Sequence, residues 1–222
     1  MYEVAISILK ELNELGYTSY IIGGYPRDRL LNQSNDDIDI CTSATPDIIK
    51  KQYEIIIDNS KYGSLQIKKN NYYFEITTFR IELEYHGRYP KIKYTNDILE
   101  DLNRRDFTIN TFCIDQYGQI HDFLNAESDL KNAIIRCVGD PEVKIKEDPI
   151  RILRAIRFST KLNFKIEKNL LQVIDKYQYL VLNLSNHQIA KELSKMNEKG
   201  IQQFNQLEIG RNFYARKSNG FN

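Results

Sequence analysis

The sequence predicts an α+β fold, in which a head with a mixed sheet and helices precedes a helical second part. Short apolar or alternating runs typical of strands recur through the first part, between amphipathic helical segments. From about residue 130 onward, helical periodicity dominates. We therefore expect a head at 1–133, a helical neck at 134–204 and a basic tail at 205–222.

The head is expected to open with a helix at 2–15, because apolar positions recur at helical spacing until Gly16. The next segments are predicted in chain order as a strand with a glycine turn at 19–24, a helix at 26–32, a strand at 36–42, a helix at 46–53, and strands at 53–58, 64–69 and 72–80. Residues 81–96 are loop-like, and 97–115 begins as a helix and ends in a strand. In the second part, residues 147–158 are predicted as one helix with a buried apolar side.

Composition narrows the classes of protein that fit these 222 residues. Three dispersed cysteines without a CxxC pair argue against a zinc site or a disulfide framework, and fit a reducing compartment. The N-terminus does not read as a signal peptide, and no run reaches membrane-spanning length. We therefore expect a cytoplasmic protein with no membrane partner. The sequence indicates no oligomeric state.

Charge is unevenly distributed although the formal net charge is only +1. Residues 1–60 hold 5 Lys/Arg against 10 Asp/Glu, whereas 131–222 hold 17 against 9. An acidic front and a basic back suit a metal site joined to a polyanion-binding part. Ordinary surface charge is the simpler interpretation of the totals alone.

An acidic pair lies in the segment NDDIDI. Asp37 and Asp39 are two residues apart on a predicted strand, so that both carboxylates point to the same face. Paired carboxylates repel unless a cation joins them, and hard oxygen ligands suit Mg²⁺. A solvated turn is the alternative, but Ile38 and Ile40 alternate with the acids as in a strand with one buried face.

A glycine turn precedes the acidic pair in IIGGYPRD. A strand, a Gly-Gly turn and a helix start place backbone N–H groups where they favour phosphate, and Arg27 adds a positive charge. A Gly-Gly turn alone is a weak signal. Followed by Arg27 and the acidic pair, it predicts a phosphate site beside its metal ligands.

Four ordered motifs resemble the class II tRNA nucleotidyltransferase and bacterial poly(A) polymerase family, within the polymerase-β-like nucleotidyltransferases. GGYPRDRLLNQSNDDIDICTSATP is similar to the family's GGxxRD turn and DxDxxT strand. DLNRRDFTIN contains the motif RRDFTIN, EDPIRILRAIRF matches the EDPxRxxRAxRF helix, and VGDP matches the segment before it. The resemblance covers about residues 20–165 and implies a polymerase-β-like head followed by a helical neck.

The resemblance also implies roles for residues of the head. Asp37 and Asp39 are expected to be catalytic ligands of two Mg²⁺ ions that activate a 3′-hydroxyl for attack on an α-phosphate. The other expected nucleotide contacts in the head are Gly24 and Arg27 to the triphosphate and Arg105 and Asp106 to the ribose. Without the motif, Arg105 and Asp106 would read as a surface ion pair. Glu75 is either a third acidic group or a solvent-facing strand residue.

Arg151, Arg154 and Arg157 recur every third residue of the second part and form an arginine stripe. The same resemblance implies a role for this stripe. Asp148 and Arg151 are expected to read the pairing edge of the incoming base, accepting cytosine and adenine and rejecting uracil and guanine. Arg154 and Arg157 resemble family residues that hold the nucleotide and orient this protein template. Ion pairing with neighbouring carboxylates is the alternative, expected for Arg157 rather than for Arg151.

The chain departs from the family pattern at three places. The flexible loop appears as RIELEYHGRYP at 80–90, one residue short and without its Asp, and its presence favours C addition before A addition. The neck motif SxERIxxEL reads SNHQIAKEL, with His187 and Gln188 at the Glu and Arg positions and His187 expected at the surface. The sequence also ends soon after the neck, which suggests a minimal enzyme, a truncated chain or one part of an assembly.

RNA contacts are therefore expected from residues 159–222. Seven lysines there are candidate phosphate contacts, with a solvated helix face as the alternative: Lys161, Lys165, Lys168, Lys176, Lys191, Lys195 and Lys199.

The leading hypothesis is addition of CCA to the 3′ end of tRNA from CTP and ATP with Mg²⁺. Poly(A) addition and partial addition of only C or only A are the enzymatic alternatives. A non-catalytic RNA-binding remnant is a third hypothesis, disfavoured because Asp37, Asp39, Arg105, Asp148 and Arg151 are all retained.

Overall fold

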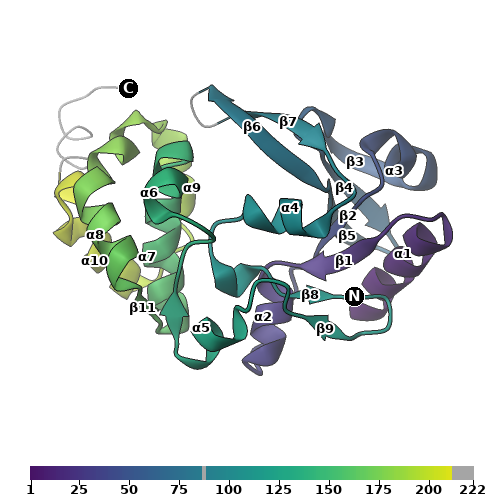
Figure 1. Ribbon diagram of the computed structural model, residues 1–222, viewed down its shortest axis with the longest axis horizontal. Helices are drawn as coiled ribbons and strands as arrows, with labels where there is room; N and C mark the ends of the chain where they lie inside the picture. Colours follow the sequence, from purple (N-terminus) through teal and green to yellow (C-terminus); the bar gives the residue numbers. More distant parts are fainter. Residues whose placement is uncertain (87–88, 212–222) are drawn as a thin grey trace. The chain divides into compact units, whose positions relative to one another are not determined.

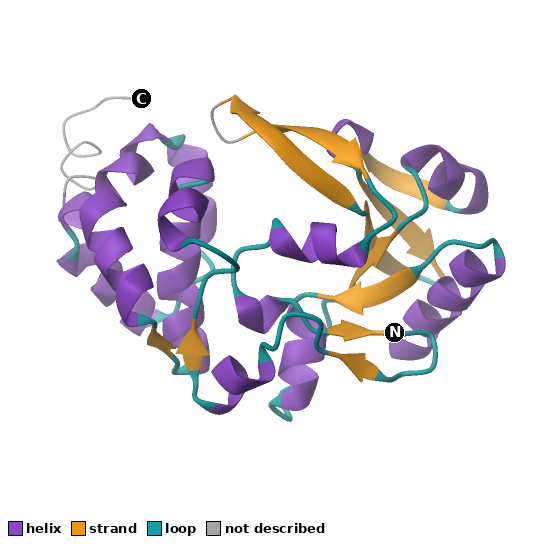
Figure 2. Ribbon diagram, viewed as in Figure 1, coloured by secondary structure: helices purple, strands orange, loops and turns teal. Residues whose placement is uncertain are grey.

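The computed structural model describes residues 1–86 and 89–211, and it divides the chain into two compact units (Figure 1). The first unit contains Met1–His86 and Pro90–Glu127, and the main part of the second begins at Ser128. This division lies slightly before the boundary predicted after residue 133. The expected order of a mixed α+β head before a helical part is confirmed (Figure 2).

The first unit is built on a seven-stranded sheet with the strand order β3-β4-β5-β2-β1-β8-β9. The strands are β1 (Ser19–Ile22), β2 (Asp39–Thr42), β3 (Glu54–Asn59), β4 (Ser64–Lys69), β5 (Tyr72–Thr78), β8 (Cys113–Ile114) and β9 (Ile120–His121). The β2–β5 pair is parallel and the other described pairs are antiparallel, so the sheet is mixed.

Helices and two 3₁₀ turns connect these strands. They are α1 (Tyr2–Glu14), α2 (Gly24–Leu30), α3 (Pro46–Gln52), η1 (Ser60–Tyr62), α4 (Ile98–Asn103) and η2 (Thr108–Asn110), with α5 (Glu127–Lys131) at the division between the units. One face of the sheet packs against α1 and α3 in a cluster that includes Leu9, Ile40 and Ile49. On the other face Leu102 of α4 packs with Cys41. Strand residues therefore alternate between two covered faces, as period-2 geometry requires.

The predicted strand at 36–42 is shorter in the structure, because β2 begins only at Asp39. Asp39 pairs with Ile22, the last residue of β1, so the preceding residues have no β1 partner. Asp37 instead donates its backbone N–H to Asn35 Oδ1 at 2.9 Å, a local contact that competes with the sheet ladder. Ile38 is nevertheless buried with Ile40 in the α1 cluster, which directs Asp39 to the opposite face.

The prediction of a loop at 81–96 is wrong. Residues in this range form β6 (Arg80–His86) and β7 (Tyr89–Tyr94), a two-stranded sheet that is separate from the main one. Leu83 is 52% exposed and Tyr94 is 37% exposed. A hairpin without a buried face shows little apolar alternation, so pattern reasoning misses it. The tip of the flexible loop, Gly87 and Arg88, lies outside the described residues.

The second unit is mainly helical, with a two-stranded parallel sheet of β10 (Ile134–Ile135) and β11 (Lys165–Ile166). Its helices are α6 (Pro141–Glu147), α7 (Ile150–Leu162), α8 (Lys168–Tyr177), η3 (Gln178–Asn183), α9 (Asn186–Leu193) and α10 (Glu198–Gln206). Helix α7 packs against α9 and α10 (Figure 1). The first two residues of the tail predicted at 205–222 belong to α10. Residues 212–222 lie outside the described residues.

The prediction of one helix at 147–158 is also wrong, because α6 ends at Glu147 and α7 begins at Ile150. Asp148 between them is extended, with φ −145° and ψ 100°. Proline disfavours the helical conformation of the residue before it, so Pro149 forces the break at Asp148. No described helix has the length and apolar character that crossing a membrane requires.

Candidate active site

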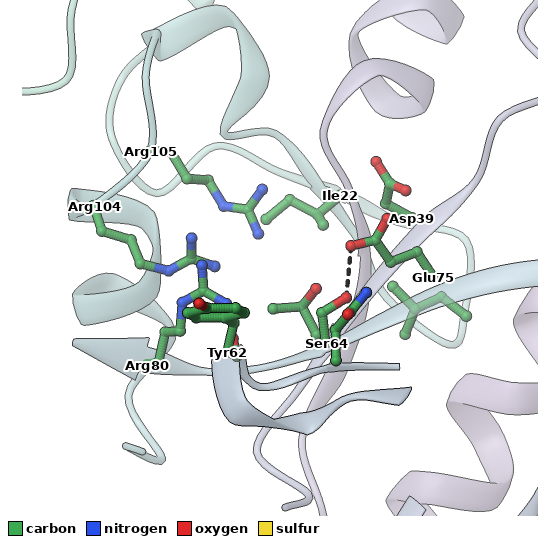
Figure 3. Close-up of a pocket in the computed structure, with 11 residues that line it drawn as sticks. Ile22, Asp39, Tyr62, Ser64, Glu75, Arg80, Arg104 and Arg105 are labelled. Carbon is green, nitrogen blue, oxygen red and sulfur yellow. Dashed lines mark hydrogen bonds between the residues drawn. The ribbon is translucent and has the colours of Figure 1, made fainter. Parts of the chain in front are cut away.

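A cavity of about 430 Å³ opens on the α4 side of the sheet in the first unit (Figure 3). One wall carries the carboxylates of Asp39 and Glu75, and the other carries three arginines. The full lining is Ile22, Asp39, Ile40, Asn59, Tyr62, Ser64, Glu75, Thr77, Arg80, Arg104 and Arg105. A hollow with acidic and basic walls can hold an anion together with a cation.

The acidic wall is set by strand register. Asp39 on β2 is the register partner of Glu75 on the parallel strand β5, so both side chains leave the sheet on the same face. Ser64 of β4 donates its hydroxyl to Glu75 Oε1 at 2.7 Å, which fixes that carboxylate (Figure 3). Glu75 is therefore a residue of the cavity wall, as one of the two sequence interpretations expected.

The basic wall is held by Asp101, whose side chain is fully buried on α4. Asp101 Oδ1 accepts from Arg104 Nε at 2.9 Å and from the backbone N–H of Arg80 at 3.2 Å. Asp101 Oδ2 accepts from Arg105 Nη2 at 3.0 Å. One buried carboxylate thus orients the side chains of Arg104 and Arg105 and holds the backbone of Arg80 at the rim of the cavity.

The charges of this wall are mutually dependent. Burial acts to raise the pKa of the Asp101 carboxyl, but Arg105 and Arg104 outweigh burial and hold that pKa below its usual value. Within the described part of the chain, Arg80 Nε and Arg105 Nε are buried without a hydrogen-bond partner. Buried donors of this kind are costly unless a partner arrives, which is what an anionic ligand in the cavity would supply.

The glycine turn lies next to the acidic wall. Gly23 precedes α2 with φ +85°, a backbone conformation that glycine adopts without strain. A Cβ atom on Gly23 would lie 3.4 Å from Asp39 Oδ2, so the turn and the carboxylate approach closely. The structure therefore brings together the turn and one acid of the predicted pair.

Arg27 lies in the interior, only 2% exposed. Its Nε donates to Asp28 Oδ1 at 2.7 Å, and its Nη1 donates to Asn110 Oδ1 at 2.5 Å. A Cβ atom on Gly24 would lie 3.4 Å from Arg27 Nη2. The guanidinium is thus packed beside the turn, where its charge supports an anion even though its described contacts are with protein groups.

The remaining predicted residues of the head differ in whether they line this cavity. Among the described residues the cavity lining includes Arg105 but not Asp37, Gly24, Arg27 or Asp106. Asp37 is exposed in the loop before β2. Asp106 is buried and accepts from Phe107 N at 2.7 Å and from Asn110 Nδ2 at 3.1 Å.

The donor set suits a hard cation that retains waters. Among the described residues no three His, Cys, Asp or Glu side chains are grouped closely enough to hold a metal by themselves. Mg²⁺ is commonly bound by one or two carboxylates together with water and substrate phosphates. Asp39 beside Glu75, facing a basic wall, fits this kind of partial coordination.

The base-reading residues predicted from the sequence lie in the second unit. Asp148 occupies the break between α6 and α7, and its Oδ1 accepts from Ile150 N at 3.2 Å. Arg151 is 6% exposed, and its Nη1 donates to Lys144 O at 2.6 Å and to Glu147 Oε2 at 2.8 Å. The expectation that Arg151 avoids a neighbouring carboxylate is wrong, because the carboxylate of Glu147, the last residue of α6, reaches the Arg151 guanidinium across the break at Asp148.

The next two arginines of the stripe surround one aromatic ring. The guanidinium carbons of Arg154 and Arg157 lie 5.4 and 4.6 Å from the centroid of the Phe158 ring. Arg157 Nη1 also lies 3.0 Å from Glu192 Oε2 of α9, which confirms the ion pairing expected for Arg157. Helix α9 therefore anchors α7 although the family's Glu and Arg are replaced there.

His187 and Gln188 of α9 occupy the positions where the family motif has Glu and Arg. His187 is exposed, as predicted. Gln188 completes a capping box with Ser185: Gln188 N donates to Ser185 Oγ at 3.3 Å, and Ser185 N donates to Gln188 Oε1 at 2.9 Å. The substituted residue stabilises the helix start.

Sequence reasoning missed several residues of this site, namely Asn35, Tyr62, Ser64, Asp101 and Asn110. Asp101 had a usable signal, because it lies three and four positions before Arg104 and Arg105, a spacing that pairs side chains on a helix. The others depend on contacts between distant segments, such as Ser64 with Glu75.

Known proteins match this chain along most of its length. A family model described as Poly A polymerase head domain matches residues 19–136. A CCA-adding enzyme of Ligilactobacillus salivarius (strain UCC118) is 36% identical over 216 residues, which cover 94% of this chain and 54% of that protein.

Solved structures agree with these sequence matches. A Bacillus stearothermophilus CCA-adding enzyme in complex with CTP gives a TM-score of 0.82 at 32% identity, covering 87% of this chain and 48% of that one. A Thermotoga maritima CCA-adding enzyme complexed with tRNA gives 0.73 at 27% identity, covering 91% and 50%. The chain thus spans about half the length of the relatives that it matches.

Proposed function

Because the chain belongs to the Poly A polymerase head domain family, we propose that it transfers nucleotides to RNA without a nucleic-acid template. The proposed reaction adds C, C and A in order to the 3′ end of tRNA from CTP and ATP, with release of pyrophosphate. The observation that carries this proposal is the cavity in which Asp39 and Glu75 face Arg80, Arg104 and Arg105.

The cavity offers separate places for the two charges of a metal-bound nucleoside triphosphate. The arginine wall provides donors for phosphate oxygens, and the two buried Nε atoms that have no hydrogen-bond partner among the described residues lie in this wall. Asp39 is the proposed cation ligand in the wall, and Asp37 in the adjoining loop is proposed as the second family ligand. Two Mg²⁺ ions, when bound, would lower the pKa of the RNA 3′-hydroxyl and offset charge on the phosphates.

Three groups of the first unit are assigned to orient the substrate. The turn at Gly24, supported by the buried charge of Arg27, is proposed to face the triphosphate. Arg105 and Asp106 are proposed to hold the ribose, where a carboxylate that accepts from the 2′-hydroxyl favours ribonucleotides. Positioning and charge stabilisation of this kind supply most of the catalysis in phosphoryl-type transfer.

Base selection is assigned to Asp148 and Arg151. A carboxylate can accept from the exocyclic amino group of cytosine or adenine, and a guanidinium can donate to the adjacent ring nitrogen. Uracil and guanine would present a carbonyl to the carboxylate. Two hydrogen-bond acceptors would then face each other without a donor, which disfavours these bases. The contacts of Arg151 with Glu147 and Lys144 hold the guanidinium in one place, which this reading requires. Arg154 and Arg157 are proposed to hold the nucleotide and orient this pair.

RNA contact is assigned to the second unit. The seven lysines singled out from the sequence are all exposed there. Phosphate contacts from such side chains release counterions, so binding should weaken steeply as salt rises. The three buried free cysteines support the proposed reducing, cytoplasmic setting.

The experiment that tests this function is extension of a tRNA transcript that lacks its 3′ CCA. CTP, ATP, UTP and GTP are offered singly, and then CTP with ATP, in the presence of Mg²⁺. We expect two steps with CTP and a third only when ATP is also present. A long A ladder would instead indicate poly(A) addition, one kind of step would indicate partial addition, and no extension would contradict transfer.

A further inference from the structure

Asn35 uses both ends of its side-chain amide in the first unit. Its Nδ2 donates to Asp28 Oδ2 at 2.7 Å, and its Oδ1 accepts the backbone N–H of Asp37 at 2.9 Å. It lies in the loop before β2 and is only partly exposed. Asn35 therefore links Asp37, two residues further along the loop, to Asp28 on α2.

The group on α2 is itself rigidly held. Asp28 and Arg27 are each 2% exposed, and Arg27 Nη2 lies 2.6 Å from Asp28 Oδ1. Arg27 continues to Asn110, and Asn110 donates to Asp106 at 3.1 Å. A continuous series of hydrogen bonds thus runs from the Asp37 backbone through Asn35, Asp28, Arg27 and Asn110 to Asp106.

Packing around the glycine turn gives a second, independent observation. A Cβ atom on Gly24 would lie only 3.2 Å from Asn35 Nδ2, closer than most Cβ contacts. The loop amide is therefore pressed against the turn that is proposed to face the triphosphate. The Asn35 side chain thus lies beside the turn and also contacts Asp37.

We propose that Asn35 is the positioning residue of the acidic loop, because it fixes Asp37 against the buried Arg27–Asp28 pair. This inference rests on the proposed function for its meaning, since Asp37 is assigned there as a cation ligand. Only a side chain with a donor and an acceptor at this length makes both contacts. An aspartate would oppose Asp28 with a second carboxylate, and an alanine would make neither contact.

The test compares Asn35→Ala and Asn35→Asp with the matched control Gln33→Ala, an exposed position in the same loop. Hydrogen exchange at the Asp37 amide is measured by NMR on the full chain without RNA or nucleotide. Mn²⁺ affinity is measured by electron paramagnetic resonance, and kcat and KM for CTP by primer extension. Thermal unfolding of each variant checks that the fold is retained.

We expect both Asn35 variants to exchange the Asp37 amide faster than the unmodified chain. Mn²⁺ affinity should fall about 10-fold to 100-fold, the usual effect of losing a residue that orients a metal ligand. We also expect kcat to fall in both Asn35 variants. A high metal concentration should restore kcat in part, which would not occur if only the fold were weakened. Gln33→Ala should match the unmodified chain in every measurement.

Two results would overturn the inference. Unchanged exchange at Asp37 in Asn35→Ala would show that Asn35 does not hold the loop. Wild-type behaviour of Asn35→Asp would show that the contact with Asp28 is not required. Because exchange and Mn²⁺ binding are measured without RNA, a chain that passes both but adds no nucleotide would contradict the proposed function alone.

Discussion

Asp39 and Glu75 are register partners on the parallel strands β2 and β5, and both line the same cavity. Two carboxylates on adjacent strands repel each other unless a cation or proton lies between them. Ser64 holds Glu75 in place through a hydrogen bond that does not neutralise it. This pairing is the reason to treat Glu75 as part of the acidic wall.

Glu75→Gln should raise the Mg²⁺ concentration that nucleotide transfer requires. The amide keeps the shape of the side chain and an oxygen for Ser64, but removes one negative charge from the wall. The measurement is the rate of single C addition across a Mg²⁺ titration. Glu54→Gln, at an exposed position of β3, is the control and should behave as the unmodified chain. Equal Mg²⁺ dependence of both variants would remove Glu75 from the site.

Asp101→Asn should destabilise the first unit, because it leaves Arg104 and Arg105 beside a neutral group. Removing one partner of a buried ion pair costs about 3–5 kcal/mol. The free energy of unfolding by urea measures this loss. Glu100→Gln, at the exposed neighbouring position, should change it little.

The ion pairing of Asp101 with Arg104 and Arg105 also predicts how the free energy of unfolding depends on pH. The pKa of Asp101 is lower in the folded state than in the unfolded chain, so the unfolded state binds the proton more readily. The stabilisation from Asp101 is therefore present at neutral pH and is lost as the pH falls through the lowered pKa. The difference in unfolding free energy between the unmodified chain and Asp101→Asn should shrink in that range.

The cysteines should resist thiol reagents while the chain is folded. All three are buried, and burial raises the pKa of Cys113 to about 12 and that of Cys41 well above its usual value. The thiolate is the reactive form, so few reactive thiolates exist at pH 8. Titration with an aromatic disulfide should detect little thiol before unfolding and three thiols after it. Fast reaction of the folded chain would contradict this burial.

Arg151→Ala should damage the choice of base more than the transfer step. The truncation removes the proposed donor to the base and leaves Asp39 and Glu75 in the first unit unchanged. The measurement is the ratio of kcat/KM for CTP to that for UTP. Arg136→Ala, which changes an exposed arginine paired with Asp129, is the control. A ratio unchanged by Arg151→Ala would end the assignment of base reading to this residue.

Much of the fold could be predicted because local pattern and burial agree. Ile6, Ile8, Leu9 and Leu12 of the predicted helix at 2–15 are buried in α1, and the predicted runs at 64–69 and 72–80 formed the paired strands β4 and β5, with β5 ending at Thr78. The failures occurred where tertiary or local chemistry overrides periodicity. Pro149 divides the expected helix, the Asn35–Asp37 contact delays β2, and β6 pairs with β7 in a sheet separate from the main one.

The candidate site was predictable in part. Arg105 and Asp39 were expected from motifs, and both line the cavity. Asp101 and Asn35 were not expected, because each acts through groups that only folding brings together, such as Asn35 with Asp28. The assignment of metal binding to Asp37 and Asp39 and of nucleotide contacts to the other predicted residues stays a prediction; these are Gly24, Arg27, Arg105, Asp106, Asp148, Arg151, Arg154 and Arg157.

The most direct test of the central claim compares the unmodified chain with Asp39→Asn on a tRNA transcript that ends before CCA. Both proteins are supplied with CTP, ATP and Mg²⁺, and products are resolved at single-nucleotide steps. We predict that the unmodified chain adds C, C and A, and that Asp39→Asn adds none. Thermal unfolding of Asp39→Asn should show that this variant is still folded. Equal extension by both proteins, or none by the unmodified chain, would contradict nucleotidyl transfer at this cavity.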